Sequence, residues 1–126
     1  MKQSKKRTAL YCRVALADPL GMERQRQSAQ CIAEQFSEQT NVIFEDNGYS
    51  GLRLDRPAFQ QLLYEIENER VHCIVVTEIS RLFRSYQLMK GFLALCQTHS
   101  VVIYTSEGQL SFDELFPLEQ KGGSRK

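Results

Sequence analysis

The sequence of 126 residues has no long apolar run, which argues against a transmembrane helix. A helix needs about 20 consecutive, mostly apolar residues to cross a bilayer, and no stretch of the chain approaches that length. The amino terminus, residues 1–7, is basic, but the apolar stretch of about 7–15 residues that completes a secretory signal does not follow it. We therefore expect a cytoplasmic protein without a membrane partner.

Closely spaced metal-binding residues are also missing. No two of the cysteines have the Cys-x-x-Cys spacing of structural zinc sites, and the two histidines add no ligand pattern. Three of the four cysteines fall in apolar segments, where a thiol is typically a small buried side chain in a reducing compartment. We expect no metal site. The residues concerned are Cys12, Cys31, Cys73, Cys96, His72 and His99.

An excess of one charge is absent as well, since the formal net charge is +1. The chain is therefore not a strongly basic nucleic-acid-binding protein, and any contact with DNA must come from a local cluster of basic residues. The length suits one domain with a substantial core, and 42% hydrophobic and 25% charged residues are ordinary values for a soluble globular protein.

The chain does contain short apolar segments that alternate with helical patterns. The apolar segments are rich in β-favouring residues and predict strands at 8–14, 41–44, 71–76 and 101–104. Between them, apolar residues recur at i, i+3, i+4 and i+7, which predicts helices from Met22, from Pro57 and from about Ser80 to Thr98. This order favours an α/β fold with three layers: a mostly parallel sheet of four to five strands, with helices on both faces.

The chain divides into three parts. We expect a flexible basic terminus at 1–7, the α/β domain at 8–110, and a flexible segment at 111–126. Residues 111–116 favour a short helix that Pro117 would stop. Within the domain, residues 46–51 have the composition of a mobile loop.

Four arginines lie near the ends of predicted strands: Arg13, Arg56, Arg81 and Arg84. Ligands of open α/β sheets bind outside the carboxyl ends of the strands. Arginine suits phosphate there, because its planar guanidinium donates two parallel hydrogen bonds. We expect Arg81 and Arg84 on one face of a helix that Ser80 caps, beside the unpaired N–H groups of its first turn. The pattern predicts a phosphate-binding site.

Two observations qualify this prediction. The arginines could instead be solvated, or paired with Glu78 and Asp46. In addition, Ala15 lies two residues after Arg13 and has a methyl group where catalysis would need a hydroxyl. Phosphate binding is therefore easier to argue than catalysis.

Five short motifs occur in the order and approximate spacing of one known family. They are Tyr11-Cys12-Arg13-Val14, Glu23-Arg24-Gln25-Arg26, Asp46-Asn47-Gly48-Tyr49-Ser50-Gly51, Leu54-Asp55-Arg56-Pro57 and Ser80-Arg81-Leu82-Phe83-Arg84. On these motifs, which span about residues 7–108, the chain resembles the catalytic domain of the serine site-specific recombinases (resolvases, invertases and large phage integrases). It is most similar to the large integrases, whose first strand often reads Tyr-Cys-Arg-Val-Ser.

The resemblance implies a reaction and its residues. Family members recombine DNA by attacking a backbone phosphate with a serine hydroxyl, which forms a covalent phosphoserine link without a metal or nucleotide cofactor. The implied partners are DNA and a second copy or a full-length serine recombinase. The family's phosphate-holding arginines match Arg13, Arg56, Arg81 and Arg84, and its supporting polar residues match Gln25, Asp46 and Ser50, with Ser80 beside them.

The chain departs from the family at two places. The nucleophilic serine falls at Ala15, so covalent cleavage by the family's route should be absent. The family continues into a long helix that builds the dimer and then into a DNA-binding domain, whereas here Pro117 interrupts that stretch and the sequence ends at Lys126. We therefore expect no strong sequence-specific DNA binding from this chain alone.

Three functions remain open. The chain is a recombinase catalytic domain that is inactive because of Ala15, or a non-enzymatic regulator that binds DNA or pairs with an active recombinase. The third possibility is a small α/β domain that binds another phosphorylated ligand, which the five motifs in register disfavour.

Overall fold

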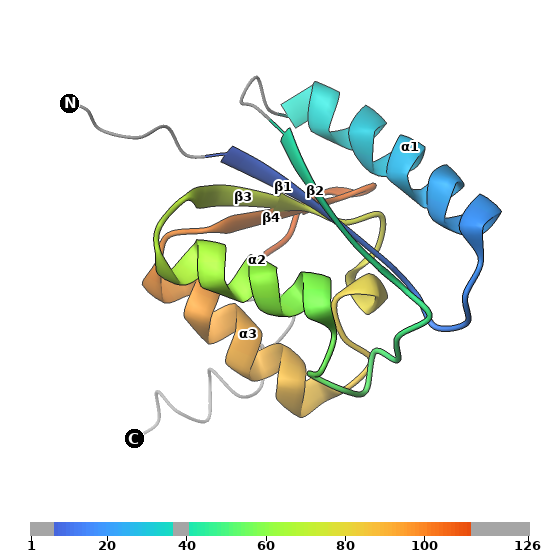
Figure 1. Ribbon diagram of the computed structural model, residues 1–126. Coiled ribbons are helices and arrows are strands. Elements are labelled where there is room, and N and C mark those ends of the chain that lie inside the picture. Colours follow the sequence, from blue (N-terminus) through green and yellow to red (C-terminus); the bar gives the residue numbers. More distant parts are fainter. Residues whose placement is uncertain (1–6, 37–40, 112–126) are drawn as a thin grey trace.

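The structure, a computed structural model, describes residues 7–36 and 41–111. The strands are β1 (Arg7–Val14), β2 (Asn41–Asn47), β3 (Val71–Val75), β4 (Val102–Thr105) and β5 (Gly108–Gln109), and the helices are α1 (Pro19–Phe36), α2 (Pro57–Glu67), the short 3-10 helix η1 (Ile79–Arg81) and α3 (Tyr86–Thr98). The sheet order is β2-β1-β3-β4-β5, and only β5 is antiparallel to its neighbour. In Figure 1, α1 covers one face of the sheet, while α2 and α3 cover the other. The predicted three-layer α/β fold is confirmed.

β1 lies inside the sheet, between β2 and β3, and is buried on both faces. Side chains alternate along a strand, so Ala9 and Tyr11 pack into the core under α2 and α3. Leu10 and Cys12 pack into the second core, under α1. A strand covered on both faces is apolar almost throughout, which is why this segment was recognisable in the sequence. The two cores hold the carboxyl end of β1 between the layers.

An aromatic cluster joins α2 and α3. Phe59 of α2 lies 5.2 Å, between ring centroids, from Phe92 of α3 and 5.0 Å from Phe83 in the turn before α3. The Phe59–Phe83 pair is close to edge-to-face, a favourable arrangement for aromatic rings. Tyr11 of β1 meets the same Phe59 ring at 5.7 Å. The cluster therefore fixes the turn that carries Arg84 against the sheet.

α1 begins at Pro19, three residues before the predicted start. Asp18 caps it, because its Oδ1 accepts a hydrogen bond of 3.0 Å from the Gly21 amide. Pro19 occupies the first helical position, where its missing N–H costs nothing. Gly21, two residues after Pro19, also lies within the helix, so the first turn contains two residues that are uncommon inside helices.

The third predicted helix, from about Ser80 to Thr98, is wrong in its first part. The chain instead forms η1, makes a turn, and starts α3 at Tyr86 with Ser85 as the N-cap residue. An α-helix would need the Ser80 and Arg81 carbonyls as acceptors for the amides four residues later. Both carbonyls accept hydrogen bonds from the Arg13 side chain, and the Arg84 amide donates to the Gly51 carbonyl. Tertiary contacts thus prevent a helix over this stretch.

The predicted loop at 46–51 begins later than expected, because Asp46 and Asn47 belong to β2. Gly48 has a φ of +90°, a conformation that favours glycine. The amides of Gly48 and Tyr49 both donate to the Val14 carbonyl, at 2.8 and 3.0 Å. The loop therefore starts against the end of β1.

Some predictions lie partly or wholly outside the described residues. They concern the flexible segments at 1–7 and 111–126 and the short helix at 111–116; Arg7 itself is the first residue of β1. Among the helices of the described part of the chain, none is both long and apolar enough to span a membrane.

Candidate functional site

The candidate site lies at the carboxyl ends of β1 and β2 and in the segments that follow β3. Parallel strands end at the same edge of the sheet, so polar residues from distant parts of the sequence meet there. Arg13 comes from β1, Asp46 from β2, and Ser80 and Arg81 from η1. We call Arg13, Arg56, Arg81 and Arg84 the arginine cluster.

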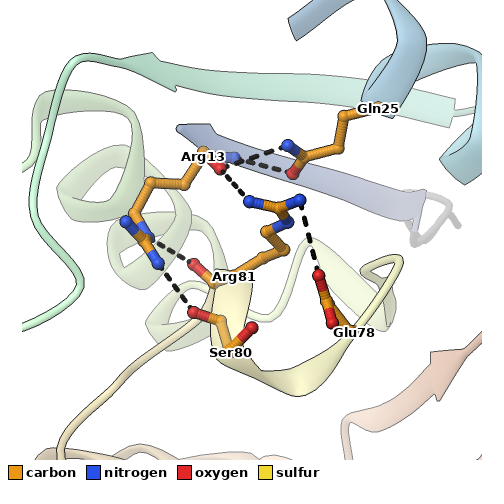
Figure 2. A network of polar contacts seen from close by, with 5 residues as sticks. All are labelled: Arg13, Gln25, Glu78, Ser80 and Arg81. Carbon is orange, nitrogen blue, oxygen red and sulfur yellow. Dashed lines mark hydrogen bonds and ion pairs between the residues drawn. The ribbon is translucent and has the colours of Figure 1, made fainter. Parts of the chain in front are cut away.

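The Arg13 side chain is buried and donates to three backbone carbonyls. Its Nε donates to the Arg81 carbonyl at 2.9 Å, and its two terminal nitrogens donate to the Ser80 and Tyr49 carbonyls at 2.7 and 3.0 Å. Figure 2 shows the two bonds to η1. Only 2% of Arg13 is exposed, so the guanidinium faces the protein.

The backbone of Arg13 is held just as closely. Gln25 of α1 accepts from the Arg13 amide at 2.9 Å and donates to the Arg13 carbonyl at 3.1 Å. The Arg81 side chain donates to the same carbonyl at 3.2 Å. Arg13 and Arg81 are therefore bonded reciprocally, side chain to backbone in both directions. Gln25 therefore connects α1 to the end of β1, and the supporting role implied for it stays a prediction.

Asp46 is a buried carboxylate that caps α2 from the neighbouring strand. It accepts hydrogen bonds from the amides of Ala58 and Phe59 at 2.8 and 3.0 Å, and from the Tyr11 hydroxyl at 2.6 Å. The first-turn amides and the helix dipole stabilise a negative charge there. Burial raises the pKa of Tyr11 well above its ordinary value, and the hydrogen bond to Asp46 raises it further.

Arg56 is fully buried among aromatic rings. Its guanidinium carbon lies 4.3, 4.9 and 5.6 Å from the ring centroids of Phe59, Phe83 and Tyr11. These distances suit cation–π attraction. None of its three side-chain nitrogens has a hydrogen-bond partner within the described residues. Burial lowers the pKa of Arg56, and the nearby charge of Asp46 opposes that shift. Sequence reasoning placed Arg56 against phosphate, whereas the structure directs it into the core.

Arg81 and Arg84 are the more accessible members of the cluster. Arg81 is partly exposed and lies 3.4 Å from Glu78, the ion pair that the sequence left open as an alternative. Its Nε is buried and has no partner in the part of the chain that the structure describes. Arg84 is exposed, and across residues 7–36 and 41–111 its side chain makes no hydrogen bond or ion pair.

The hydroxyl-bearing candidates differ in their contacts. Ser50 accepts from the Leu52 amide through its Oγ at 3.0 Å, which closes a local turn. Ser80 contributes its backbone carbonyl, and the cap expected of it belongs instead to Ser85. Ala15 is exposed, one residue beyond the end of β1, and offers a methyl group.

Positive charge exceeds negative charge in this region. The four guanidinium groups lie with two carboxylates, Asp46 and the exposed Glu78. Burial lowers the pKa of Arg13, and the charges of Arg56, Arg81 and Arg84 lower it further. Like charges held this close are relieved by an anion, so the electrostatics favour a negatively charged ligand.

Sequence reasoning missed two residues of the site. One is Tyr11, whose hydroxyl binds Asp46. The other is Gly51, where a Cβ atom would lie 2.8 Å from a terminal nitrogen of Arg13 and 2.9 Å from the Cγ of Arg84. Only a glycine lets the loop backbone approach both side chains this closely. The glycine in a loop motif was a usable signal, whereas nothing in the sequence indicated the partner of Tyr11.

Metal binding finds no support in the described residues, among which no three His, Cys, Asp or Glu side chains cluster in a way that could hold an ion.

Comparison with known proteins assigns the chain to a family. The family model "Resolvase, N terminal domain" matches residues 8–119. A search of curated protein sequences gave no significant match. Among solved structures, the chain is similar to the N-terminal catalytic domain of TP901-1 integrase, with 24% identity, a TM-score of 0.77 and 93% of each chain covered.

Two further structures have similar folds. A serine recombinase from Sulfolobus solfataricus has 25% identity and a TM-score of 0.62, with 88% of this chain and 75% of that chain covered. A resolvase family site-specific recombinase from Streptococcus pneumoniae has 23% identity and a TM-score of 0.72, with 94% and 85% covered. Because the family model matches most of the sequence, the chain belongs to the resolvase N-terminal domain family, the catalytic-domain family of the serine recombinases.

Proposed function

We propose that this chain is a serine-recombinase catalytic domain that holds a DNA backbone phosphate at its arginine cluster but does not cleave the DNA. The family of the chain and the excess of positive charge at the sheet edge support the binding half of the proposal. Arg84 and Arg81 are its accessible guanidinium groups, and arginine is well suited to phosphate.

Ala15 is the single observation that supports the second half of the proposal, namely that the chain does not cleave DNA. It lies two residues after Arg13, at the position of the family's nucleophilic serine, and its methyl group has no lone pair with which to attack phosphorus. A cluster that positions a phosphate can still bind one without that hydroxyl, since positioning and electrostatic stabilisation come from other groups.

Neither nearby serine is a good substitute nucleophile. The Ser50 hydroxyl already accepts a hydrogen bond in its own turn, and Ser80 lies on η1 rather than at the end of β1. An attack on phosphorus needs the entering and leaving oxygens roughly in line, so a hydroxyl on another segment would approach from the wrong direction.

The test is to restore the hydroxyl. We expect Ala15→Ser to form a covalent protein–DNA adduct on supercoiled substrate, detected by denaturing gel electrophoresis, and the unmodified chain to form none. The matched control is the double variant Ala15→Ser/Arg84→Gln. It has the hydroxyl but lacks the exposed guanidinium, so adduct formation should be strongly reduced, by roughly a hundredfold for a lost electrostatic contact to the transition state.

The other results separate the interpretations. An adduct from the unmodified chain would contradict the proposal, and removal of Ser50 or Ser80 would then identify the attacking residue. If the unmodified chain binds DNA but Ala15→Ser gives no adduct, the non-enzymatic regulator becomes the better interpretation. If neither protein binds DNA at low salt, the arginine cluster is not a DNA phosphate site.

A further inference from the structure

We propose that three exposed leucines beside the arginine cluster contact the deoxyribose and base edges of DNA next to the held phosphate. They are Leu16, Leu20 and Leu52, and we call them the leucine rim. The inference rests on the proposed function, because it names a second part of the DNA that the same site would touch.

The first argument is that exposed apolar side chains are concentrated at the edge of the sheet that carries the site. Leu16, Leu20 and Leu52 are 84%, 65% and 63% exposed, the three highest values among the large hydrophobic residues that the structure describes. Two further exposed residues, Tyr49 and Leu54, lie in the same loop as Leu52. Single exposed apolar residues are normal on a protein surface, whereas a group of them at one place marks an interaction site.

The second argument is that the rim is carried by two connections that are bonded to each other. Its first two members lie in the connection from β1 to α1 and in the first turn of α1, and the third lies in the loop between β2 and α2. The Asp18 amide donates to Oδ1 of Asn47 at 2.8 Å, and a Cβ atom at Gly48 would lie 3.5 Å from that of Ala17. Figure 1 shows both connections at the end of the sheet where β1 and β2 stop.

The third argument is that the rim adjoins the arginine cluster. Leu52 directly follows Gly51, whose backbone lies against the side chains of two members of the cluster. Leu16 directly follows Ala15, which the proposed function aligns with the family's nucleophilic serine. A backbone phosphate held at the cluster has a deoxyribose on each side, with the bases beyond. Apolar side chains from both connections would therefore be near those sugars and bases.

The charge of this face favours DNA over a second copy of the chain. A ligand must offer negative charge to the arginine cluster and apolar surface to the leucine rim. DNA offers phosphate together with sugar and base edges, and leucine is one of the apolar residues that proteins insert against bases. Two copies paired through this face about a two-fold axis would instead bring their arginine clusters together, and like charges oppose that pairing.

The experiment measures binding of a short fluorescent DNA duplex at several salt concentrations. Leu16→Ser/Leu52→Ser removes one leucine from each connection and keeps all four arginines. We expect binding to weaken by roughly tenfold with an unchanged slope of log K against log salt, because an apolar contact releases no counterions. Arg84→Gln should instead lower that slope by about 0.9, the value for one lost phosphate contact.

Two further variants are the controls. Leu16→Met/Leu52→Met keeps apolar side chains of similar size, so binding should stay within about twofold of that of the unmodified chain. Tyr64→Ser removes an exposed hydrophobic residue elsewhere and should leave binding unchanged. Tyr64 lies in the last turn of α2, and its ring is 5.4 Å from the guanidinium carbon of Arg70, just before the amino end of β3.

Three results would overturn the inference. One is unchanged binding in Leu16→Ser/Leu52→Ser while Arg84→Gln keeps its effect, in which case the proposed function still stands. Another is a reduced salt slope in the double serine variant, which would mean that the arginine cluster had been disturbed. The third is a dimer of the free unmodified chain in sedimentation that the double serine variant dissociates, since the rim would then join two copies. If the unmodified chain does not bind the duplex at low salt, the proposed function itself fails.

Discussion

At the scale of single residues, Asp46 shows how one side chain can join three elements. It belongs to β2, accepts a hydrogen bond from Tyr11 of β1, and accepts two more from the first turn of α2. It is also the carboxylate whose charge acts on the buried Arg56. The supporting role that the family resemblance implies for Asp46 stays a prediction, whereas the hydrogen bonds assign it a structural role between β1 and α2.

We expect Asp46→Ala to lower the free energy of unfolding by about 3–5 kcal/mol. The variant removes a helix cap, leaves the Tyr11 hydroxyl without its partner, and takes a counter-charge from Arg56. Urea unfolding followed by circular dichroism would measure the loss. Asp55→Ala is the control, because Asp55 is exposed and its ion pair with Arg53 lies at the surface, so this variant should change stability little. A loss below about 1 kcal/mol for Asp46→Ala would contradict the structural role.

At the scale of elements, the short segment from η1 to α3 is the part that sequence patterns did not predict. Helical periodicity continued smoothly through residues 80–98, and local propensity alone offered no reason to divide it. Partners from distant parts of the sequence bond to this segment instead: the Arg13 side chain, 67 positions before Ser80, donates to the Ser80 carbonyl, and the Arg84 amide donates to the Gly51 carbonyl. A contact over that separation is not encoded in a window of neighbouring residues.

The start of α3 can be tested directly. We expect Ser85→Ala to lower the free energy of unfolding by about 1 kcal/mol, because the Ser85 Oγ accepts from the Leu88 amide at the helix start. Ser80→Ala should cost less than about 0.5 kcal/mol, since the structure uses only the backbone carbonyl of Ser80. Thermal unfolding of the two variants provides the comparison. A larger loss from Ser80→Ala than from Ser85→Ala would mean that the helix begins where the sequence suggested.

At the scale of the whole molecule, both cores contain buried thiols. Cys12 and Cys73 lie in the core under α1, and Cys96 lies in the core under α2 and α3. Burial raises the pKa of Cys12 and Cys96 to about 12 and that of Cys73 to about 11. The expectation of small buried side chains is correct for these three cysteines, and Cys31 is exposed.

We therefore expect stability to fall as the pH rises above about 9. A thiol in the unfolded chain loses its proton near pH 8.5, whereas the buried thiols retain theirs, so the unfolded state binds fewer protons. The stability that each buried thiol contributes is complete below the thiol pKa of the unfolded chain. It is lost as the pH rises towards about 12 for Cys12 and Cys96. Each thiol adds at most about 1.4 kcal/mol per pH unit.

Urea unfolding under reducing conditions, from roughly pH 8 to pH 10.5, would measure this dependence. Cys96→Ala should make the stability less sensitive to pH, although it lowers stability at every pH by creating a small cavity. Cys31→Ser should leave the pH dependence unchanged, because Cys31 is exposed. A stability independent of pH over this range would contradict the burial of the thiols.

The sequence by itself determined the layers, the parallel sheet and the family. The spacing of apolar residues in each segment indicates which faces of that strand or helix are buried, as β1, which is buried on both faces, illustrates. The sequence also identified the four arginines and Ala15 as candidate residues, because residue types and predicted strand ends can be read along the chain. Only the tertiary structure decided where each guanidinium points: Arg13 to backbone carbonyls, Arg56 into aromatic rings, and Arg84 to solvent. The physical reason is that the direction of a long side chain depends on the partners that folding brings within its reach. The partners of Arg13 and Arg56 come largely from distant segments of the chain.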